Sequence, residues 1–262
     1  GRVVRTVDIP LPGMSMVHDL SITDRYVVVY DQPVLVDLDL VVAERFPFRW
    51  SDDYGNRVGL MPRDGDAGDI VWVDVPVGYV FHPLNAYDTP DGKVVLDVCF
   101  YDTMMRDDLR GPFGDSLPRL LRWEVDPVAR RVHETVIDDH VNEFPRHRGS
   151  LTGKPYRYGY CAQVDLHAMH WPTVKHDLHT GTRTVFDHGP GRAAGEAVFV
   201  GRPGSTEEDD GWLVMFVHET DATEFVVLDA QDFDRGYVAR VRLPQRVPFG
   251  FHGNWAPDAP TP

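Results

Sequence analysis

Hydrophobic and polar positions alternate along this chain in short runs, and glycine, proline, aspartate or asparagine bounds each run. A two-residue period is typical of β-strands, because successive side chains point to opposite faces of a sheet. Valine, leucine and aromatic residues dominate the runs, which favours strands near the centre of stacked sheets. The clearest runs are residues 26–38, 69–76, 92–101 and 211–219. The pattern therefore predicts an all-β fold, in which the best helical stretch is a short one around Pro118–Leu121.

A loose repeat of strand, acidic turn and strand occurs in the second half of the chain. The repeats cover residues 120–138, 173–188 and 224–244, and their turns carry Asp126, Asp177 and Asp229. They start roughly fifty residues apart, an interval that favours the blades of a β-propeller, each a small antiparallel sheet. A β-sandwich is the alternative. We expect one domain over residues 1–255 and a flexible tail over residues 256–262.

The composition and charge of the chain indicate which kinds of binding partner are expected. The 262 residues include 41 acidic and 26 Lys or Arg residues, for a formal net charge of −15. A field of this sign repels phosphate backbones, so nucleic-acid binding is not expected. The chain has no apolar run of about eighteen residues, which argues against a transmembrane helix. Peripheral contact with a membrane through an apolar patch stays open.

The two cysteines, Cys99 and Cys161, have no paired spacing and lie in strand-like runs. They are predicted to be buried, reduced thiols. The first residues contain no apolar core of a signal peptide. Both observations indicate a cytoplasmic location.

Most of the twelve histidines have an ordinary setting. A group of four lies close together: His167, His170, His176 and His179. No cysteine and no His-Glu-x-x-His helix accompanies them, so a surface loop running into a hairpin is favoured over a zinc site. Five more are interpreted as surface or hairpin residues: His133, His140, His147, His188 and His218.

Three histidines have a different setting: His18, His82 and His252. Each follows apolar residues and precedes a polar or turn-forming residue, which predicts a position at the end of a strand. Propeller strands that end near the central axis converge there, so histidines far apart in sequence can share one ion. A hydrogen-bonded core histidine is the alternative for each.

Two glutamates, Glu143 and Glu196, stand beside apolar residues that should be buried. A buried carboxylate is costly unless it is paired or hydrogen-bonded. Next to a metal, such a carboxylate usually accepts the second ring N–H of a liganding histidine. The alternative is a salt bridge to a nearby arginine, for which the candidates are Arg146, Arg148 and Arg202.

Five segments resemble the signature blocks of the carotenoid cleavage oxygenase family and occur in that family's order. They are residues 16–34, 80–88, 141–146, 195–217 and 248–255. The resemblance implies a seven-bladed β-propeller with Fe(II) on its axis, held by four histidines. It implies that three of these ligands are His18, His82 and His252. It also implies that Glu143 orients His82 and that Glu196 orients His252.

The family's activity is the cleavage of a carbon–carbon double bond of a carotenoid or apocarotenoid with O2, which gives two carbonyl products. Cleavage of a stilbene by a member of the same family is the close alternative. Neutral imidazoles suit ferrous iron, and no catalytic group beyond the ligands is expected. The protein would supply position and a dry apolar tunnel for a lipophilic alkene. Candidate lining residues are Phe81, Tyr87, Phe251 and Trp255.

This chain departs from the family pattern at its start. The first histidine ligand, the blades around it and the glutamate expected to orient His18 have no counterpart in the sequence. The resemblance therefore covers the C-terminal part of the family's fold, and we expect an incomplete propeller that lacks N-terminal blades. Completion by another chain and a catalytically inactive fragment without iron are the alternatives.

Overall fold

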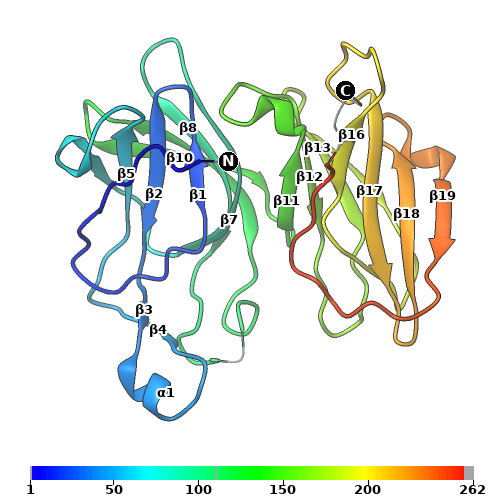
Figure 1. The fold of residues 1–262 in the computed structure, drawn as a ribbon, viewed down its shortest axis with the longest axis horizontal. Coiled ribbons are helices and arrows are strands. Elements are labelled where there is room, and N and C mark those ends of the chain that lie inside the picture. Colours follow the sequence, from blue (N-terminus) through cyan, green and yellow to red (C-terminus); the bar gives the residue numbers. More distant parts are fainter. Residues whose placement is uncertain (1, 110, 257–262) are drawn as a thin grey trace. The chain divides into compact units, whose positions relative to one another are not determined.

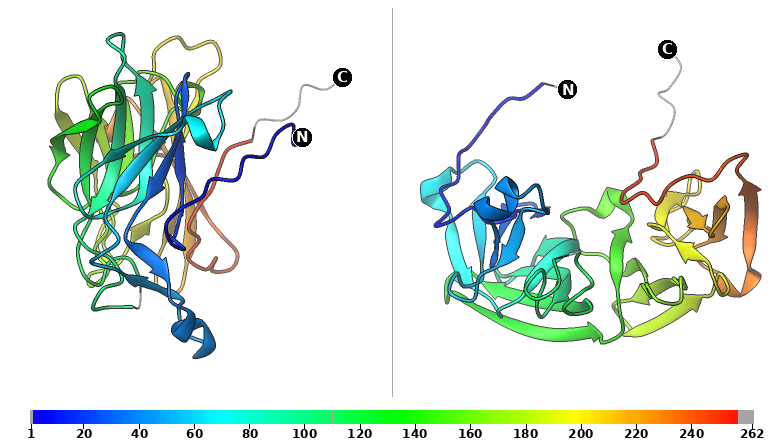
Figure 2. Two further views of the ribbon diagram at one scale, coloured as in Figure 1. Left: turned by 90° about the vertical axis from the view of Figure 1, so that its left-hand side faces the viewer. Right: turned by 90° about the horizontal axis from the view of Figure 1, so that it is seen from below.

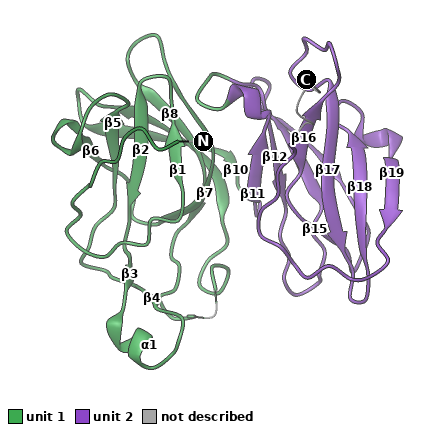
Figure 3. Ribbon diagram, viewed as in Figure 1, with its two compact units in different colours: residues 1–139, 152–155 green, residues 140–151, 156–262 purple. Residues whose placement is uncertain are grey.

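The structure is a computed structural model that describes residues 2–109 and 111–256, and nearly all of its regular structure is β (Figure 1). The all-β prediction is confirmed. The chain divides into two compact units (Figure 3). Unit 1 comprises residues 1–139 and 152–155, and unit 2 comprises residues 140–151 and 156–262. Within the described ranges, no helix has both the length and the apolar character that crossing a bilayer requires.

Unit 1 contains two antiparallel sheets of four strands each. The first has the order β1 (Leu20–Ile22), β2 (Tyr26–Asp31), β5 (Arg57–Pro62) and β6 (Val71–Asp74). The second has the order β10 (Arg131–Asp138), β9 (Arg119–Asp126), β8 (Val94–Tyr101) and β7 (Tyr79–Asp88). A ribbon of β3 (Val34–Val36) and β4 (Phe48–Trp50) carries α1 (Leu38–Val42) between its strands, and η1 spans Ala67–Asp69. Figure 2 shows α1 protruding from this unit.

The core of unit 1 lies between its two sheets. All eight residues of β8 are buried, which explains why its sequence is apolar almost without alternation. The one charged residue of this strand, Asp97, receives two hydrogen bonds from the Arg122 guanidinium, at 2.7 and 2.8 Å. The buried Trp123 indole donates to Glu134 Oε2 at 2.8 Å. The buried Asp97 carboxylate and the Trp123 indole N–H are thus paired, which offsets the cost of their desolvation.

Unit 2 also contains two antiparallel sheets. The first has the order β11 (Glu143–His147), β12 (Tyr158–Ala162), β13 (Thr173–Asp177) and β14 (Thr182–Phe186). The second has the order β15 (Ala193–Ala194), β17 (Gly211–His218), β18 (Thr223–Asp229) and β19 (Tyr237–Arg242), and β16 (Val198–Gly201) also pairs with β17. Two 3-10 turns complete the unit, η2 (Gly149–Leu151) and η3 (Phe233–Arg235). Buried side chains such as Tyr160, Leu213 and Leu228 form its core.

The predicted repeat corresponds to three hairpins, β9–β10, β13–β14 and β18–β19. An aspartate caps each turn by accepting backbone N–H groups that follow it. Asp126 accepts from Val128 and Ala129, Asp177 from His179 and Thr180, and Asp229 from Gln231. Besides the β3–β4 ribbon, each of the four larger sheets is antiparallel and has four or five strands, and small antiparallel sheets are the elements from which a β-propeller is built.

The stretch around Pro118–Leu121, which has the best helical pattern in the sequence, is not helical in the structure. Residues from Arg119 onward form β9, and Leu120 and Leu121 are fully buried where this strand pairs with β8. Cross-strand pairing therefore overrides the local preference of a short segment. The predicted strand over residues 26–38 is instead two strands, β2 and β3. The second of them is followed directly by α1, because the Asp37 carboxylate caps the N-terminus of that helix.

Two further expectations concern the cysteines and the chain end. Cys99 and Cys161 are buried thiols, as predicted. The tail expected over residues 256–262 lies, apart from Ala256, outside the described residues.

Candidate metal centre

None of the three singled-out histidines ends a strand, so that part of the prediction is wrong. His82 lies inside the ten-residue strand β7 and is 5% exposed. The register between β7 and β8 shifts on both sides of His82, between Val80 and His82 and again between Pro83 and Asn85. Such bulges re-aim a side chain within a sheet. His18 instead precedes β1, and His252 lies in the irregular segment after β19.

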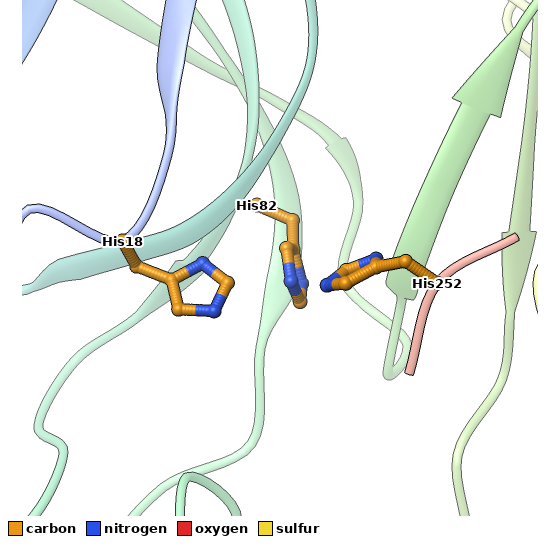
Figure 4. A group of neighbouring side chains, drawn as sticks. All are labelled: His18, His82 and His252. Atoms are coloured by element: carbon orange, nitrogen blue, oxygen red, sulfur yellow. The ribbon is translucent and has the colours of Figure 1, made fainter. Parts of the chain in front are cut away.

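The structure brings His18 and His82 together in unit 1. Their ring centroids lie 4.9 Å apart in an edge-to-face arrangement, and one ring nitrogen of each lies within 4.8 Å of the other. Phe81 packs against both rings, stacked on His18 at 4.0 Å and edge-on to His82 at 4.7 Å. Figure 4 draws the three candidate histidines, of which His18 and His82 belong to unit 1. Two imidazoles at this separation suit a shared divalent cation.

In unit 2, the Glu196 carboxylate contacts the Nδ1 edge of the His252 ring. His252 Nδ1 lies 3.0 Å from Glu196 Oε1, and the Gly253 N–H donates to Glu196 Oε2 at 2.9 Å. Glu196 is 9% exposed, whereas the His252 side chain is 48% exposed. When the Nδ1 proton is donated to the carboxylate, Nε2 carries the lone pair that a metal requires. The hydrogen bond between these two side chains is the one that the family resemblance implied.

The three arginines considered as salt-bridge partners of the two glutamates make different contacts. Arg146 Nη1 lies 3.8 Å from Glu196 Oε2, so Glu196 contacts both a histidine and an arginine. Arg148 donates to the backbone carbonyls of residues 207 and 208, and Arg202 pairs with aspartates instead of Glu143 or Glu196. Glu143 is fully buried at the start of β11. Its expected contact with His82 joins residues of different units and stays a prediction.

A pocket of about 290 Å³ adjoins His252 in unit 2. Two of the four aromatic residues predicted to line a tunnel, Phe251 and Trp255, lie on this pocket. The rest of its wall is mainly apolar and includes Val214, Met215, Phe216 and Phe225. This pocket can therefore hold an apolar chain beside the exposed imidazole.

Tyr87 lies farther along β7 than Phe81, the other predicted lining residue on this strand. It is five residues from His82 along β7, roughly 16 Å at the rise of an extended strand. Its ring is 6.0 Å from the Arg122 guanidinium carbon. Burial raises the pKa of the Tyr87 hydroxyl. A role for Tyr87 in a tunnel remains a prediction.

Two histidines interpreted as surface or hairpin residues, His188 and His218, are buried. His188 Nδ1 lies 2.8 Å from the Tyr237 hydroxyl and Nε2 lies 2.9 Å from Thr173 Oγ1. Burial lowers the pKa of His188 to about 4, and burial also lowers the pKa of His218. The sequence carries no local signal for this, because the groups that cover His188 come from other strands.

The four histidines that lie close together in the sequence make separate contacts in the structure. His170 Nε2 lies 2.7 Å from Asp187 Oδ1 at the surface. His176 is buried in β13, and its Nε2 lies 2.9 Å from Asn142 Oδ1. His167 and His179 are exposed. Of the described residues, these four do not form a group that could hold a metal ion.

Comparison with known proteins gives consistent matches. The family model described as retinal pigment epithelial membrane protein matches residues 1–257. A carotenoid cleavage oxygenase of Mycobacterium tuberculosis is 37% identical over 98% of this chain and 61% of its own length. An apocarotenoid-15,15'-oxygenase of Synechocystis is 33% identical over 98% of this chain and 55% of its own length. The crystal structure of cobalt-substituted Synechocystis ACO matches with a TM-score of 0.84 at 32% identity, over 94% of this chain and 54% of that chain. The chain thus spans between 54% and 61% of the length of these three proteins.

Proposed function

Because this chain belongs to the retinal pigment epithelial membrane protein family, we propose that the protein is a non-haem Fe(II) dioxygenase acting on a carotenoid or apocarotenoid. The reaction is the cleavage of one carbon–carbon double bond by O2, which places one oxygen atom on each of two carbonyl products. The names of the relatives, a carotenoid cleavage oxygenase and an apocarotenoid oxygenase, support this reaction class. Among the observations on this chain, the bond between His252 and Glu196 carries most weight.

The proposed metal ligands are His18, His82 and His252, the set that the family resemblance implies. Three features support this set: the close ring nitrogens of His18 and His82, the carboxylate behind His252, and a relative whose crystal structure contains cobalt. Ferrous iron, when bound, supplies the activation of O2, and neutral imidazoles suit that ion. The donor set of this chain fits Fe(II), although it is one histidine short of the family's four.

The chain's own residues would position and shield the reaction. Glu196 holds the His252 ring in one orientation and tautomer, and Phe81 restricts the rings of His18 and His82 by packing. Phe251 and Trp255 would exclude water from the apolar pocket next to His252 and hold the alkene there. Such positioning contributes by fixing the reacting double bond close to the site.

The decisive experiment measures iron content and O2-dependent aldehyde formation by the purified protein. β-Apocarotenal and resveratrol, offered separately, distinguish a polyene-cleaving from a stilbene-cleaving enzyme. We expect bound iron and aldehyde from the apocarotenal. Because three histidines bind Fe(II) more weakly than four, iron should be supplied in excess.

Variants of two histidines test the ligand assignment. His252→Ala should abolish iron binding, whereas His133→Ala, which replaces an exposed hairpin histidine, should leave it unchanged. Unchanged iron binding in His252→Ala would contradict the ligand set. Absence of iron and product in the wild-type chain, beside an active relative, would favour the inactive fragment.

We also propose a peripheral membrane contact through α1, because the substrate class partitions into lipid. Leu38, Val42 and Phe46 at this helix are 61%, 84% and 49% exposed, and Figure 2 shows the helix protruding from unit 1. Apolar side chains on a protrusion can enter the interface of a bilayer. The net charge of −15 disfavours anionic lipid, so a zwitterionic surface is the expected partner.

Co-sedimentation with phosphatidylcholine vesicles tests this contact. Val42→Asp should reduce the bound fraction several-fold, because a charge at the interface opposes insertion. Val128→Asp is the matched control, because Val128 is also highly exposed, at 94%, on a hairpin turn of the same unit. Equal binding by Val42→Asp and the wild type would exclude a contact through α1.

A further inference from the structure

The first strand of unit 2 contains an irregularity beside the candidate site. β11 pairs with β12 through Glu143↔Ala162 and Arg146↔Tyr160, so three steps along β11 match two steps along β12. The extra residue defines a β-bulge. Phe144 within it has a φ of 51°, a left-handed conformation that bulky residues rarely adopt. An unfavourable backbone conformation that persists beside a functional site is a reason to ask what it achieves.

The register shows what the bulge does to side-chain direction. Ala162 and Tyr160 are two residues apart, so they face the same side of the sheet. Their partners Glu143 and Arg146 therefore face that side together. In a regular strand, residues three apart would face opposite sides, and Arg146 would point away from Glu143. The bulge thus sets the direction of Arg146.

Arg146 uses this direction to contact both flanks of His252. Its Nη2 donates to Asn254 Oδ1 at 3.3 Å, and its Nη1 lies 3.8 Å from Glu196 Oε2. Glu196 is the residue that holds His252 Nδ1 and the Gly253 N–H. The Phe144 ring adds an edge-to-face contact to His252, with centroids 6.4 Å apart. The guanidinium therefore joins β11 to the segment that carries the histidine.

We propose that Arg146 is a positioning residue for His252 and that the Phe144 bulge delivers it. The segment around His252 forms no strand, so side-chain contacts must fix its place. A cation beside Glu196 restricts the carboxylate to the orientation in which one oxygen accepts from Nδ1 and the other from Gly253. The importance of this role for iron rests on the proposed function, but the geometric role does not.

Hydrogen exchange of the Gly253 amide in metal-free protein tests the geometric role. Arg146→Met keeps the aliphatic stem and removes the cation, so Gly253 should exchange about 10-fold faster as its acceptor becomes mobile. Arg146→Lys should recover part of the protection. Arg148→Met is the matched control, because Arg148 contacts Ser150 and two carbonyls but neither Glu196 nor Asn254. It should leave Gly253 exchange unchanged.

Co(II) affinity and the visible Co(II) spectrum form the second arm. Outer partners of ligands change metal affinity by about 10–100-fold, and Arg146 acts one contact further out, so Arg146→Met should weaken Co(II) by about 3–10-fold and alter the spectrum. Wild-type Gly253 exchange in Arg146→Met overturns the proposal. Faster Gly253 exchange with no Co(II) bound by any variant supports the positioning role and counts against the proposed function alone.

A substitution at Phe144 distinguishes the effect of the bulged backbone from that of the Phe144 side chain. It also tests the proposal if Arg146→Met does not fold. Glycine adopts a left-handed conformation without strain. Phe144→Gly should therefore preserve the bulge and, with it, the direction of Arg146. Gly253 protection should then stay near the wild-type value despite the loss of the ring. Protection as low as in Arg146→Met would show that the Phe144 ring, rather than Arg146, holds the segment, and would overturn the proposal.

Discussion

Two candidate ligands, His82 in unit 1 and His252 in unit 2, are held in different ways. His82 in unit 1 lies within a long strand whose backbone hydrogen bonds fix it, and it is almost completely buried. His252 in unit 2 lies on a segment without strand pairing, and its side chain is about half exposed. A ladder of backbone bonds positions the first, whereas the Glu196 and Arg146 side chains position the second. A single side-chain substitution should therefore disturb the His252 site without unfolding the unit that carries it.

The largest expected effect tests whether the units are independent in stability. Leu96 in unit 1 and Leu228 in unit 2 are both fully buried in separate cores. Leu96→Ala and Leu228→Ala should each lower the free energy of unfolding by about 2–5 kcal/mol, through lost burial and a residual cavity. Residue-resolved hydrogen exchange should show faster opening mainly in the unit that carries the substitution. Equal acceleration in both units would show one cooperative structure instead.

The second prediction concerns acid stability, which should differ between the units because of His188. Burial holds its pKa at about 4 in the folded chain, against an ordinary value of 6.5. The unfolded chain therefore binds this proton at a higher pH than the folded chain does. Stability should fall as the pH drops from about 6.5 to 4, by about 3 kcal/mol, and level off below that range.

Denaturant titrations at several pH values measure this loss. His188→Gln should flatten the decline between pH 6.5 and 4, whereas His133→Gln, at an exposed site in unit 1, should retain it. A decline of the same depth in His188→Gln would assign the acid sensitivity to other groups.

The third prediction sharpens the contrast between backbone and side-chain positioning. Glu196→Gln should weaken metal binding by about 10–100-fold, equivalent to about 1.4–2.7 kcal/mol, because the outer carboxylate no longer fixes the ring. Glu219→Gln is the control, because Glu219 lies in the same unit and pairs with Arg192. Chelator competition measures both affinities. Wild-type affinity in Glu196→Gln would mean that the His252 segment is held by other contacts.

The smallest expected effects compare one hairpin turn from each unit. The β9–β10 and β13–β14 turns share the same aspartate cap, but the fourth residue after the aspartate is Arg130 in one and Gly181 in the other, both at positive φ. Arg130→Gly should stabilise unit 1 by about 0.5 kcal/mol, and Gly181→Ala should destabilise unit 2 by about 1 kcal/mol. Thermal unfolding checks both. The same sign of change for both variants would refute a shared turn geometry.

Local pattern predicted much of the fold because period-two alternation is a property of neighbouring residues. The strand runs and the three hairpins with their aspartate turns were predicted correctly. The segment after Pro118 was not, because β9 is a strand through its pairing with β8. Burial of His188 and His218 was missed for the same reason, since the residues that cover them are distant in sequence.

By itself, the sequence determined the all-β class, the family and the histidines that deserve testing, because these depend on residue identity and short-range order. Tertiary structure alone decided how those histidines are held. The bulges around His82, the left-handed Phe144 and the reach of Arg146 to Glu196 and Asn254 all depend on strand register. Register is set by pairing between distant segments, and a shift of one residue reverses which face a side chain occupies.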